Sequence, residues 1–160
     1  MVILLLQISD CAGSEQTRFE DHCFEYASDS TPTDIISNID ACKEKGSELW
    51  VPESSAEHFF VHQSFPGAAI TDEIYHLGIS KYENDEGFKG VDHSFYVGSA
   101  YFSLDSDVND QEGDFIKNGR CLVFNKATKI WERQDPCDNA IGVCKRKLGM
   151  VLGLYILQRY

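Results

Sequence analysis

The strongest constraint on the fold is a cysteine-rich segment, residues 120–147, which holds three of the chain's six cysteines. Two strand-like runs, residues 122–124 and 129–132, are separated by the tetrapeptide Asn-Lys-Ala-Thr, which suits the short turn of a β-hairpin. The cysteines of this segment are Cys121, Cys137 and Cys144. We therefore predict a hairpin pinned by cysteines, with the rest of the chain arranged around it.

The cysteine count and the net charge narrow the class of protein. Six cysteines in 160 residues favour disulfides formed in an oxidising compartment, because reducing cytosol keeps thiols unpaired. No CxxC pair occurs, which argues against a structural zinc site. The net charge of −12 argues against a nucleic-acid partner and does not favour an anionic membrane surface. We expect a secreted protein with a single domain.

Both ends of the chain are apolar. Residues 1–10 resemble the hydrophobic part of a secretory signal, although no basic side chain precedes it, so we expect a truncated signal, with a first strand as the alternative. Residues 148–160 form an apolar tail of unknown role. Its apolar run would span about 15 Å as a helix, about half of the hydrocarbon thickness, so we expect no membrane span. A closing strand, an unstructured tail and a mistranslated extension remain open, and the domain itself is assigned to residues 11–147.

A first helix is predicted at residues 31–46. Thr31 can cap it, Pro32 suits its first position, and Asp34 stands where a capping-box acid belongs. Gly46 ends the run. Its inward residues, at helical spacing, are Ile35, Ile36, Ile39 and Cys42. Through Cys42 this helix would be tethered to the core.

A second helix is predicted to begin at Ser54, which forms a capping box with Glu57, and to stop at the Pro-Gly pair of residues 66–67. Its buried stripe is predicted to be Ala56, Phe59 and Phe60. From residue 74 onward the pattern turns to strands and loops.

Two histidines of this second helix, His58 and His62, lie four residues apart, so both could touch one metal ion. The residue after the first is Phe59 rather than the Glu of zinc proteases, so that motif is absent. We therefore expect both histidines to face solvent.

Several dispersed segments occur in an order and at a spacing that together are specific. They are Cys23-Phe24-Glu25-Tyr26, Cys42, Leu49-Trp50-Val51-Pro52 with Ser55 and Glu57, Tyr75-His76-Leu77-Gly78-Ile79, and Cys121, Trp131, Cys137 and Cys144. In this order the chain resembles the C-type lectin-like domain over residues 11–145, where the family often has WIGL at the place of residues 75–79. The resemblance implies an α+β fold, in which two helices flank small antiparallel sheets and a long irregular loop carries the binding site.

The resemblance also selects a disulfide pairing, which the residues alone leave open among many. It implies that Cys42–Cys144 joins the first helix to the last strand and that Cys121–Cys137 bridges the hairpin. Cys11–Cys23 would be the extra bridge of the family's long form, which has three disulfides.

In sugar-binding members of this family, a calcium ion in the long loop also coordinates the sugar, and its ligands are a Glu-Pro-Asn segment and an Asn-Asp pair after a strand tryptophan. At the first position this chain has Asp107-Val108-Asn109, and a cis bond without the family's proline costs ~2.5–4 kcal/mol. At the second it has Glu132-Arg133, and Arg133 brings a positive charge to a cation site. The resemblance therefore implies a degraded calcium site, with Asp107, Asn109 and Glu132 as its remaining metal candidates.

Acidic side chains gather in residues 105–114 without a lysine between them. The run begins like an EF-hand loop but lacks the glycine and the closing acid that such a loop needs. A solvated acidic loop is the ordinary outcome for such a run, and a calcium site is the alternative. The predicted ligand-binding residues are Tyr101, Asp105, Asp107, Asn109, Glu112, Asp114 and Glu132.

Two functions fit these observations, and the expected partner is a glycan or a protein. The first is a secreted carbohydrate-binding lectin in which calcium bridges protein and sugar. The second is a calcium-independent domain that has lost sugar binding and takes a protein ligand through Tyr96, Tyr101, Phe102 and the acidic loop. An enzyme is not expected, because the sequence has no convincing nucleophile–base pair, phosphate loop or complete metal motif.

Overall fold

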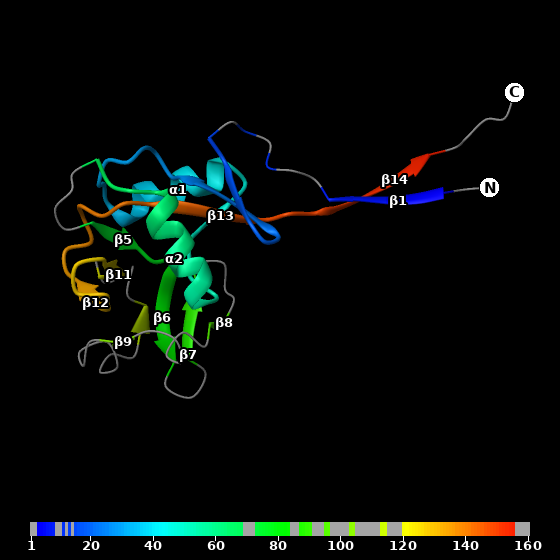
Figure 1. The fold of residues 1–160 in the computed structure, drawn as a ribbon. Helices are drawn as coiled ribbons and strands as arrows, with labels where there is room; N and C mark the ends of the chain where they lie inside the picture. The colour runs from blue at the N-terminus through cyan, green and yellow to red at the C-terminus, as the bar shows by residue number, and fades with distance from the viewer. Residues whose placement is uncertain are drawn as a thin grey trace, which may run out of the picture.

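The computed structural model describes residues 3–8, 11, 13, 15–68, 73–83, 87–90, 95–96, 103–104, 113–114 and 120–155. Within them two helices accompany small, mostly antiparallel sheets, so the predicted α+β fold is confirmed (Figure 1). The helices are α1 (Ile35–Glu44) and α2 (Ser55–Ser64).

The first sheet joins the beginning of the domain to its end, in the order β2-β3-β13-β4. Its strands are β2 (Thr17–Phe19), β3 (His22–Tyr26), β13 (Val143–Lys147) and β4 (Glu48–Leu49). All neighbours are antiparallel, and β13 pairs with both β3 and β4. The sequence-distant ends of the domain therefore close on each other.

The second sheet contains the predicted hairpin, in the order β5-β11-β12-β9. Its strands are β5 (Ile74–His76), β11 (Cys121–Asn125), β12 (Ile130–Gln134) and β9 (Ser103–Leu104). Strands β11 and β12 pair antiparallel with Phe124 opposite Trp131, which confirms the hairpin, and β9 joins β12 in parallel.

The third sheet has the order β10-β6-β7-β8 and lies in the part of the chain between β5 and β11. Its strands are β6 (Ile79–Glu83), β7 (Gly87–Gly90), β8 (Phe95–Tyr96) and β10 (Gly113–Asp114). The segment in which the long binding loop was predicted therefore also carries short paired strands.

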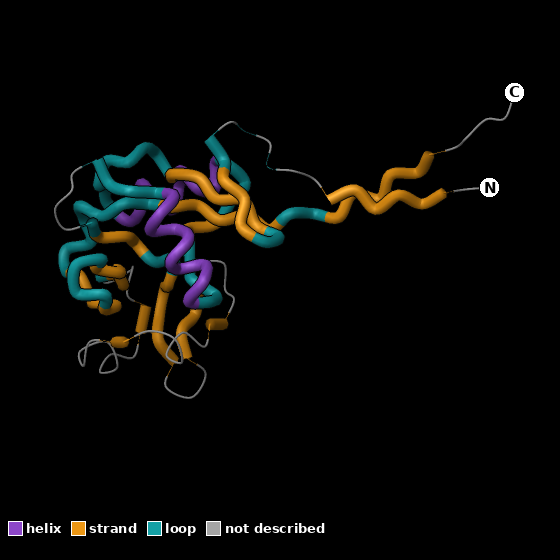
Figure 2. Tube along the Cα trace, viewed as in Figure 1, coloured by secondary structure: helices purple, strands orange, loops and turns teal. Residues whose placement is uncertain are grey.

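The two apolar ends pair with each other as a two-stranded ribbon of β1 (Ile3–Ile8) and β14 (Met150–Tyr155), with Ile8 opposite Met150. The ribbon runs away from the domain (Figures 1 and 2). A truncated signal in residues 1–10 stays a prediction. No helix in the described part of the chain has the length and apolar character needed to cross a membrane.

Helix α1 begins later than predicted, because Asp34 and not Thr31 is its N-cap. The Asp34 carboxylate accepts a hydrogen bond from the backbone N–H of Ser37 at 2.9 Å. Thr33 forms an isolated β-bridge with Ala140, which keeps the chain extended just before the helix. Ile36 was wrongly placed in the inward stripe, since half of its surface is exposed, while Gly46 ends the helix region with φ 64° as predicted.

Helix α2 has the predicted N-cap, Ser54, whose hydroxyl accepts from the backbone N–H of Glu57. The predicted buried stripe is wrong at Ala56, which is exposed, and at Phe59, which is 64% exposed, whereas Phe60 is half-buried and packs against the core. The residues that the helix buries are Glu57, His58 and Val61. The Glu57 carboxylate turns into the core, where the Trp50 indole and the Lys145 ammonium satisfy it, so the buried face carries polar groups that a search for apolar residues passes over.

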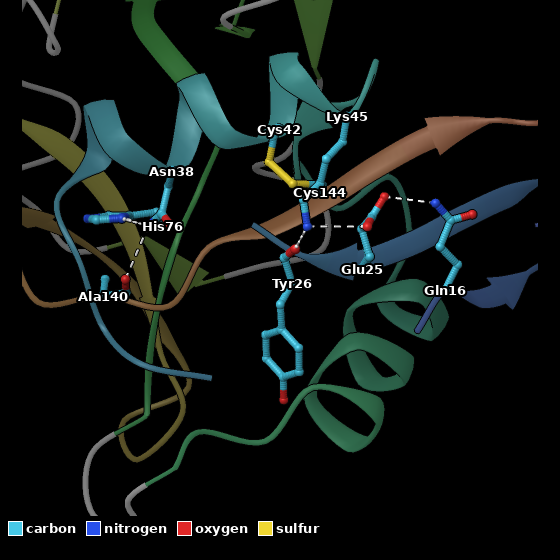
Figure 3. Close-up of a disulfide and its surroundings, with 9 residues drawn as sticks. All are labelled: Gln16, Glu25, Tyr26, Asn38, Cys42, Lys45, His76, Ala140 and Cys144. Carbon is cyan, nitrogen blue, oxygen red and sulfur yellow. Dashed lines mark hydrogen bonds and ion pairs between the residues drawn. A yellow bond between two sulfur atoms is a disulfide. The ribbon is translucent and has the colours of Figure 1, made fainter. Parts of the chain in front are cut away.

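The described core forms two clusters. One packs α2 against β3, β5, β11, β12 and β13 and contains both tryptophans, fully buried, and the other packs α1 against β4, β11 and β13. All three implied disulfides are present: Cys11–Cys23, Cys42–Cys144 and Cys121–Cys137. Cys42 joins α1 to β13 as predicted (Figure 3). Near this bridge, Lys45 Nζ at the end of α1 donates to the carbonyl of Tyr26 on β3 at 2.8 Å.

Candidate ligand-binding site

The hairpin of β11 and β12 ends in a turn that is organised by Asn125. The Asn125 side-chain oxygen accepts hydrogen bonds from the backbone N–H groups of Ala127 and Thr128, at 3.0 and 3.3 Å. Such bonds from an asparagine side chain to the residues that follow it stabilise a turn. Lys129 completes the reversal with a positive φ of 60°. The turn therefore fixes where the next residues of β12 project.

Trp131 and Glu132 follow this turn and take opposite faces of β12, since successive side chains of a strand alternate. Trp131 is fully buried opposite Phe124, and Glu132 lies opposite Val123. Arg133 returns to the face of Trp131, opposite Leu122, and is half-buried. The two residues at the position of the family's Asn-Asp pair therefore project from different faces of the strand.

Glu132, one of the three predicted metal ligands, has its carboxylate engaged by the turn. Its Oε1 accepts from the Thr128 hydroxyl at 2.7 Å, and its Oε2 accepts from the Asn125 amide at 3.3 Å. A carboxylate retains further lone pairs, but both oxygens here already serve the hairpin. Glu132 therefore stabilises the hairpin turn, a role that the sequence did not indicate. Its role as a metal ligand stays a prediction.

The other predicted site residues are described less completely. Asp114 lies on β10 with its backbone opposite Lys81 of β6. Tyr96, named for the protein-binding alternative, lies on β8 opposite Phe88. The remaining candidates fall outside the described residues: Tyr101, Phe102, Asp105, Asp107, Asn109 and Glu112. Among the residues that the structure does describe, no three His, Cys, Asp or Glu side chains gather closely enough to hold a metal ion.

A buried carboxylate, which sequence reasoning missed, forms an ion pair with a lysine of the same turn. Glu73 directly precedes β5 and is 9% exposed. It accepts hydrogen bonds from the Tyr75 hydroxyl and the Gly67 backbone, and Lys126 of the hairpin turn forms an ion pair with it. Burial acts to raise the pKa of Glu73, but the hydrogen bonds from Lys126, Tyr75 and Gly67 outweigh it and hold that pKa below its ordinary value. No local signal could reveal this pair, because 53 residues separate its members.

The expectation that His58 and His62 face solvent is wrong. His58 is 9% exposed, and the two rings lie 4.2 Å apart, centre to centre, inside an aromatic cluster. Their neighbours are Trp50, Tyr75 and Phe124. Polar residues on an otherwise amphipathic helix are expected at its surface, so only the packing of three distant segments shows that His58 is buried and His62 half-buried.

Comparison with known proteins gives a likeness of structure rather than of sequence. No protein-family model and no curated protein matches the sequence. The C-type lectin domain of murine dendritic cell inhibitory receptor 2, solved in complex with an N-glycan, superposes with a TM-score of 0.60 at 22% identity, over 86% of this chain and 99% of that one. Human lithostathine gives 0.63 at 15% identity, over 86% and 91% of the two chains.

A calcium-independent type II antifreeze protein is similar too, with a TM-score of 0.59 at 17% identity over 91% of this chain and 97% of that one. The likeness therefore extends from a domain solved with a bound N-glycan to a protein described as calcium-independent. Identities this low show the architecture and leave the ligand open. Together with the three disulfides and the buried tryptophan of β12, they show that this chain has the C-type lectin-like fold.

Proposed function

We propose that this protein is a non-enzymatic, extracellular binding protein that takes its ligand on the segment between β5 and β11 without the help of calcium. The observation that carries the proposal is the state of Glu132 and Arg133. Glu132 is hydrogen-bonded through both oxygens to its own hairpin turn, and a guanidinium follows it in the chain.

The binding role rests on the fold and its disulfides. Similar structures include a domain complexed with an N-glycan and an antifreeze protein, so the architecture supports recognition of different ligands. Three disulfides suit an oxidising environment outside the cell. They also hold the base of the binding segment rigid, because Cys121–Cys137 spans the hairpin on which that segment ends.

Independence from calcium follows from the chemistry of the donors. Calcium requires six to eight oxygen ligands, and a site loses affinity with each anionic ligand that is removed. To serve as a ligand, Glu132 would have to give up or share its bonds to Asn125 and Thr128. Arg133 adds a positive charge near any cation bound there, and Val108 replaces the proline of the family's motif.

The second candidate function is calcium-bridged recognition of a glycan. It is favoured by the acidic run of residues 105–114, whose members include Asp107 and Asn109, and by the N-glycan complex of a similar domain. In that case the loop acids would supply most of the ligands, with Glu132 joining them from β12.

Calcium titration separates the two functions, with tryptophan fluorescence and the melting temperature as readouts. Both tryptophans are buried, and Trp131 adjoins the residues in question. We expect no change in either signal up to millimolar calcium, and retention of ligands on glycan and protein arrays that is unaffected by EDTA. A saturable calcium response, with glycan binding that EDTA abolishes, would instead establish the calcium lectin.

A paired variant supplies the control. Glu132→Asn with Arg133→Asp restores the donor types that sugar-binding members carry, so calcium affinity should rise if the wild-type site is degraded only at this strand. Glu44→Asn with Lys45→Asp makes the same change of charge at the end of α1 and should leave calcium affinity unchanged.

A further inference from the structure

His58 and His62 lie one turn apart on the inner side of α2 and close a cluster of aromatic rings. The His62 ring stacks on Phe124 of β11 at 4.3 Å and on Tyr75 of β5 at 5.0 Å. The His58 ring meets Phe124 edge-on at 4.1 Å and lies 5.6 Å from Trp50. Both histidines therefore take part in the contact between α2 and the sheet that bears the hairpin.

The described acidic side chains near this cluster already form ion pairs with lysines. On α2 itself, Glu57 bonds the Trp50 indole and Lys145. Glu53, just before the helix, also pairs with Lys145.

On the opposite side, Glu73 is bound to Tyr75 and Lys126. The two nearby groups that act electrostatically on His62, His58 and Lys126, both disfavour a positive charge there. Within the described residues, no carboxylate bonds the His62 ring, whose Nε2 is buried without a hydrogen-bond partner.

Protonation would therefore place two like charges side by side among apolar rings. Burial lowers the pKa of His58 to about 4. Burial first, and then His58 and Lys126, lower the pKa of His62 to about 3. Both histidines are neutral in the folded protein at pH 7, and in mild acid the unfolded chain binds more protons than the folded one. Their stabilising contribution is thus complete above pH 6.5 and is lost as the pH falls from there toward 4 and below.

We infer that His58 and His62 form an acid-sensitive latch, which holds α2 against β5 and β11 at neutral pH and releases the helix when both rings take up protons. The latch contacts Phe124 on β11, the first strand of the hairpin on which the predicted binding segment ends. Its release would therefore loosen one support of that segment, whatever ligand the segment binds. The inference does not depend on the proposed function, since it concerns the attachment of the helix alone.

The first test uses the wild-type protein with its disulfides intact. Hydrogen exchange at pH 7 and pH 5, expressed as protection factors, compares the amides of α2 with those of β3 and β13. We expect protection in α2 to fall on the order of a hundredfold while the β3–β13 amides change much less. Equal losses in both regions, or no loss in α2, would overturn the latch.

The second test removes the titrating groups. His58→Phe with His62→Phe keeps aromatic rings in the cluster, and His22→Gln, on β3 beside Asp21, is the matched control. The urea-unfolding constant of the wild type should rise on the order of a hundredfold between pH 7 and pH 5 beyond the rise in the double variant. His76, which burial also shifts to a pKa of about 4, stays in every variant, so its contribution cancels.

His22→Gln should keep the wild-type pH dependence, and a double variant that also keeps it would refute the inference. Should the double variant not fold, ring-proton NMR of the wild type decides. Titration of His58 and His62 near pH 6.5 in a protein with α2 still protected would be the refuting result.

Discussion

The two helices of this domain are attached to the same core by different chemistry. Helix α1 is bound covalently through Cys42–Cys144, and Asn38 donates hydrogen bonds to His76 Nδ1 at 2.8 Å and to the Ala140 carbonyl at 3.2 Å (Figure 3). Helix α2 contains no cysteine. It is held by the ion pair of Glu57 with Lys145 and by the packing of its histidines.

Because of this difference, the attachments of the two helices should respond differently to acid. A disulfide survives the protonation of a neighbouring histidine, so α1 stays tied to β13 in acid even if the Asn38–His76 bond is lost. The contacts of α2 depend on which groups carry charge. The covalent attachment of α1 therefore contributes to the stability of the whole fold at any pH, whereas the attachment of α2 depends on pH.

Removing the disulfide of α1 should have the largest effect. In the chain-entropy account, the bridge Cys42–Cys144 closes a loop with a sequence separation of 102, so Cys42→Ala with Cys144→Ala should lower the free energy of unfolding by about 4–5 kcal/mol. Urea denaturation at pH 7 measures the loss. Cys11→Ala with Cys23→Ala opens a loop with a separation of 12 and should cost about 3 kcal/mol. A larger loss from the short loop than from the long one would contradict the covalent role assigned to α1.

Breaking the ion pair of α2 should come next. Lys145→Met leaves the Glu57 carboxylate, 3% exposed, without the ammonium that bonds both of its oxygens. An uncompensated buried charge makes such a change cost about 3–4 kcal/mol. Lys147→Met, two residues along β13 at an exposed position, should change stability by less than about 0.5 kcal/mol.

Adding Glu57→Gln to Lys145→Met removes the buried charge and should recover part of the loss. If Lys145→Met cost no more than Lys147→Met, the ion pair would not hold α2.

Much of the fold could be predicted from the sequence, because the features that define it are local or come in a fixed order. Two strand-like runs around a turn predict the hairpin. The cysteines, ordered as in the C-type lectin-like family, imply the three disulfides that the structure contains. Helix α2 was located correctly for the same reason, since Ser54 is a local cap signal.

The predictions from sequence were wrong where residues distant in the chain determine burial or capping. Glu57 and His58 are buried because Lys145 and the rings of Trp50, Tyr75 and Phe124 meet them from other elements. The N-cap of α1 is Asp34 and not the predicted Thr31, because Thr33 forms a β-bridge with Ala140, more than 100 residues away in the chain. Of the candidate site, Glu132 could be named from its place after Trp131, but its bonds to the turn follow only from the geometry of the hairpin.

The smallest predicted effects concern the two N-caps. Asp34→Ala and Ser54→Ala each remove an acceptor for one backbone N–H, so each should lower the free energy of unfolding by about 1 kcal/mol, and Asp34→Asn should retain most of that. Their reach should differ even though their energies agree. In α1 the loss of amide protection should stop within the first turns, because Cys42 ties the rest of the helix to β13. In α2 it should extend along the helix, because no covalent link interrupts the fraying, and hydrogen exchange at pH 7 measures both patterns. Equal spread in the two helices would show that the disulfide does not localise the disturbance, and that the two attachments differ in strength but not in kind.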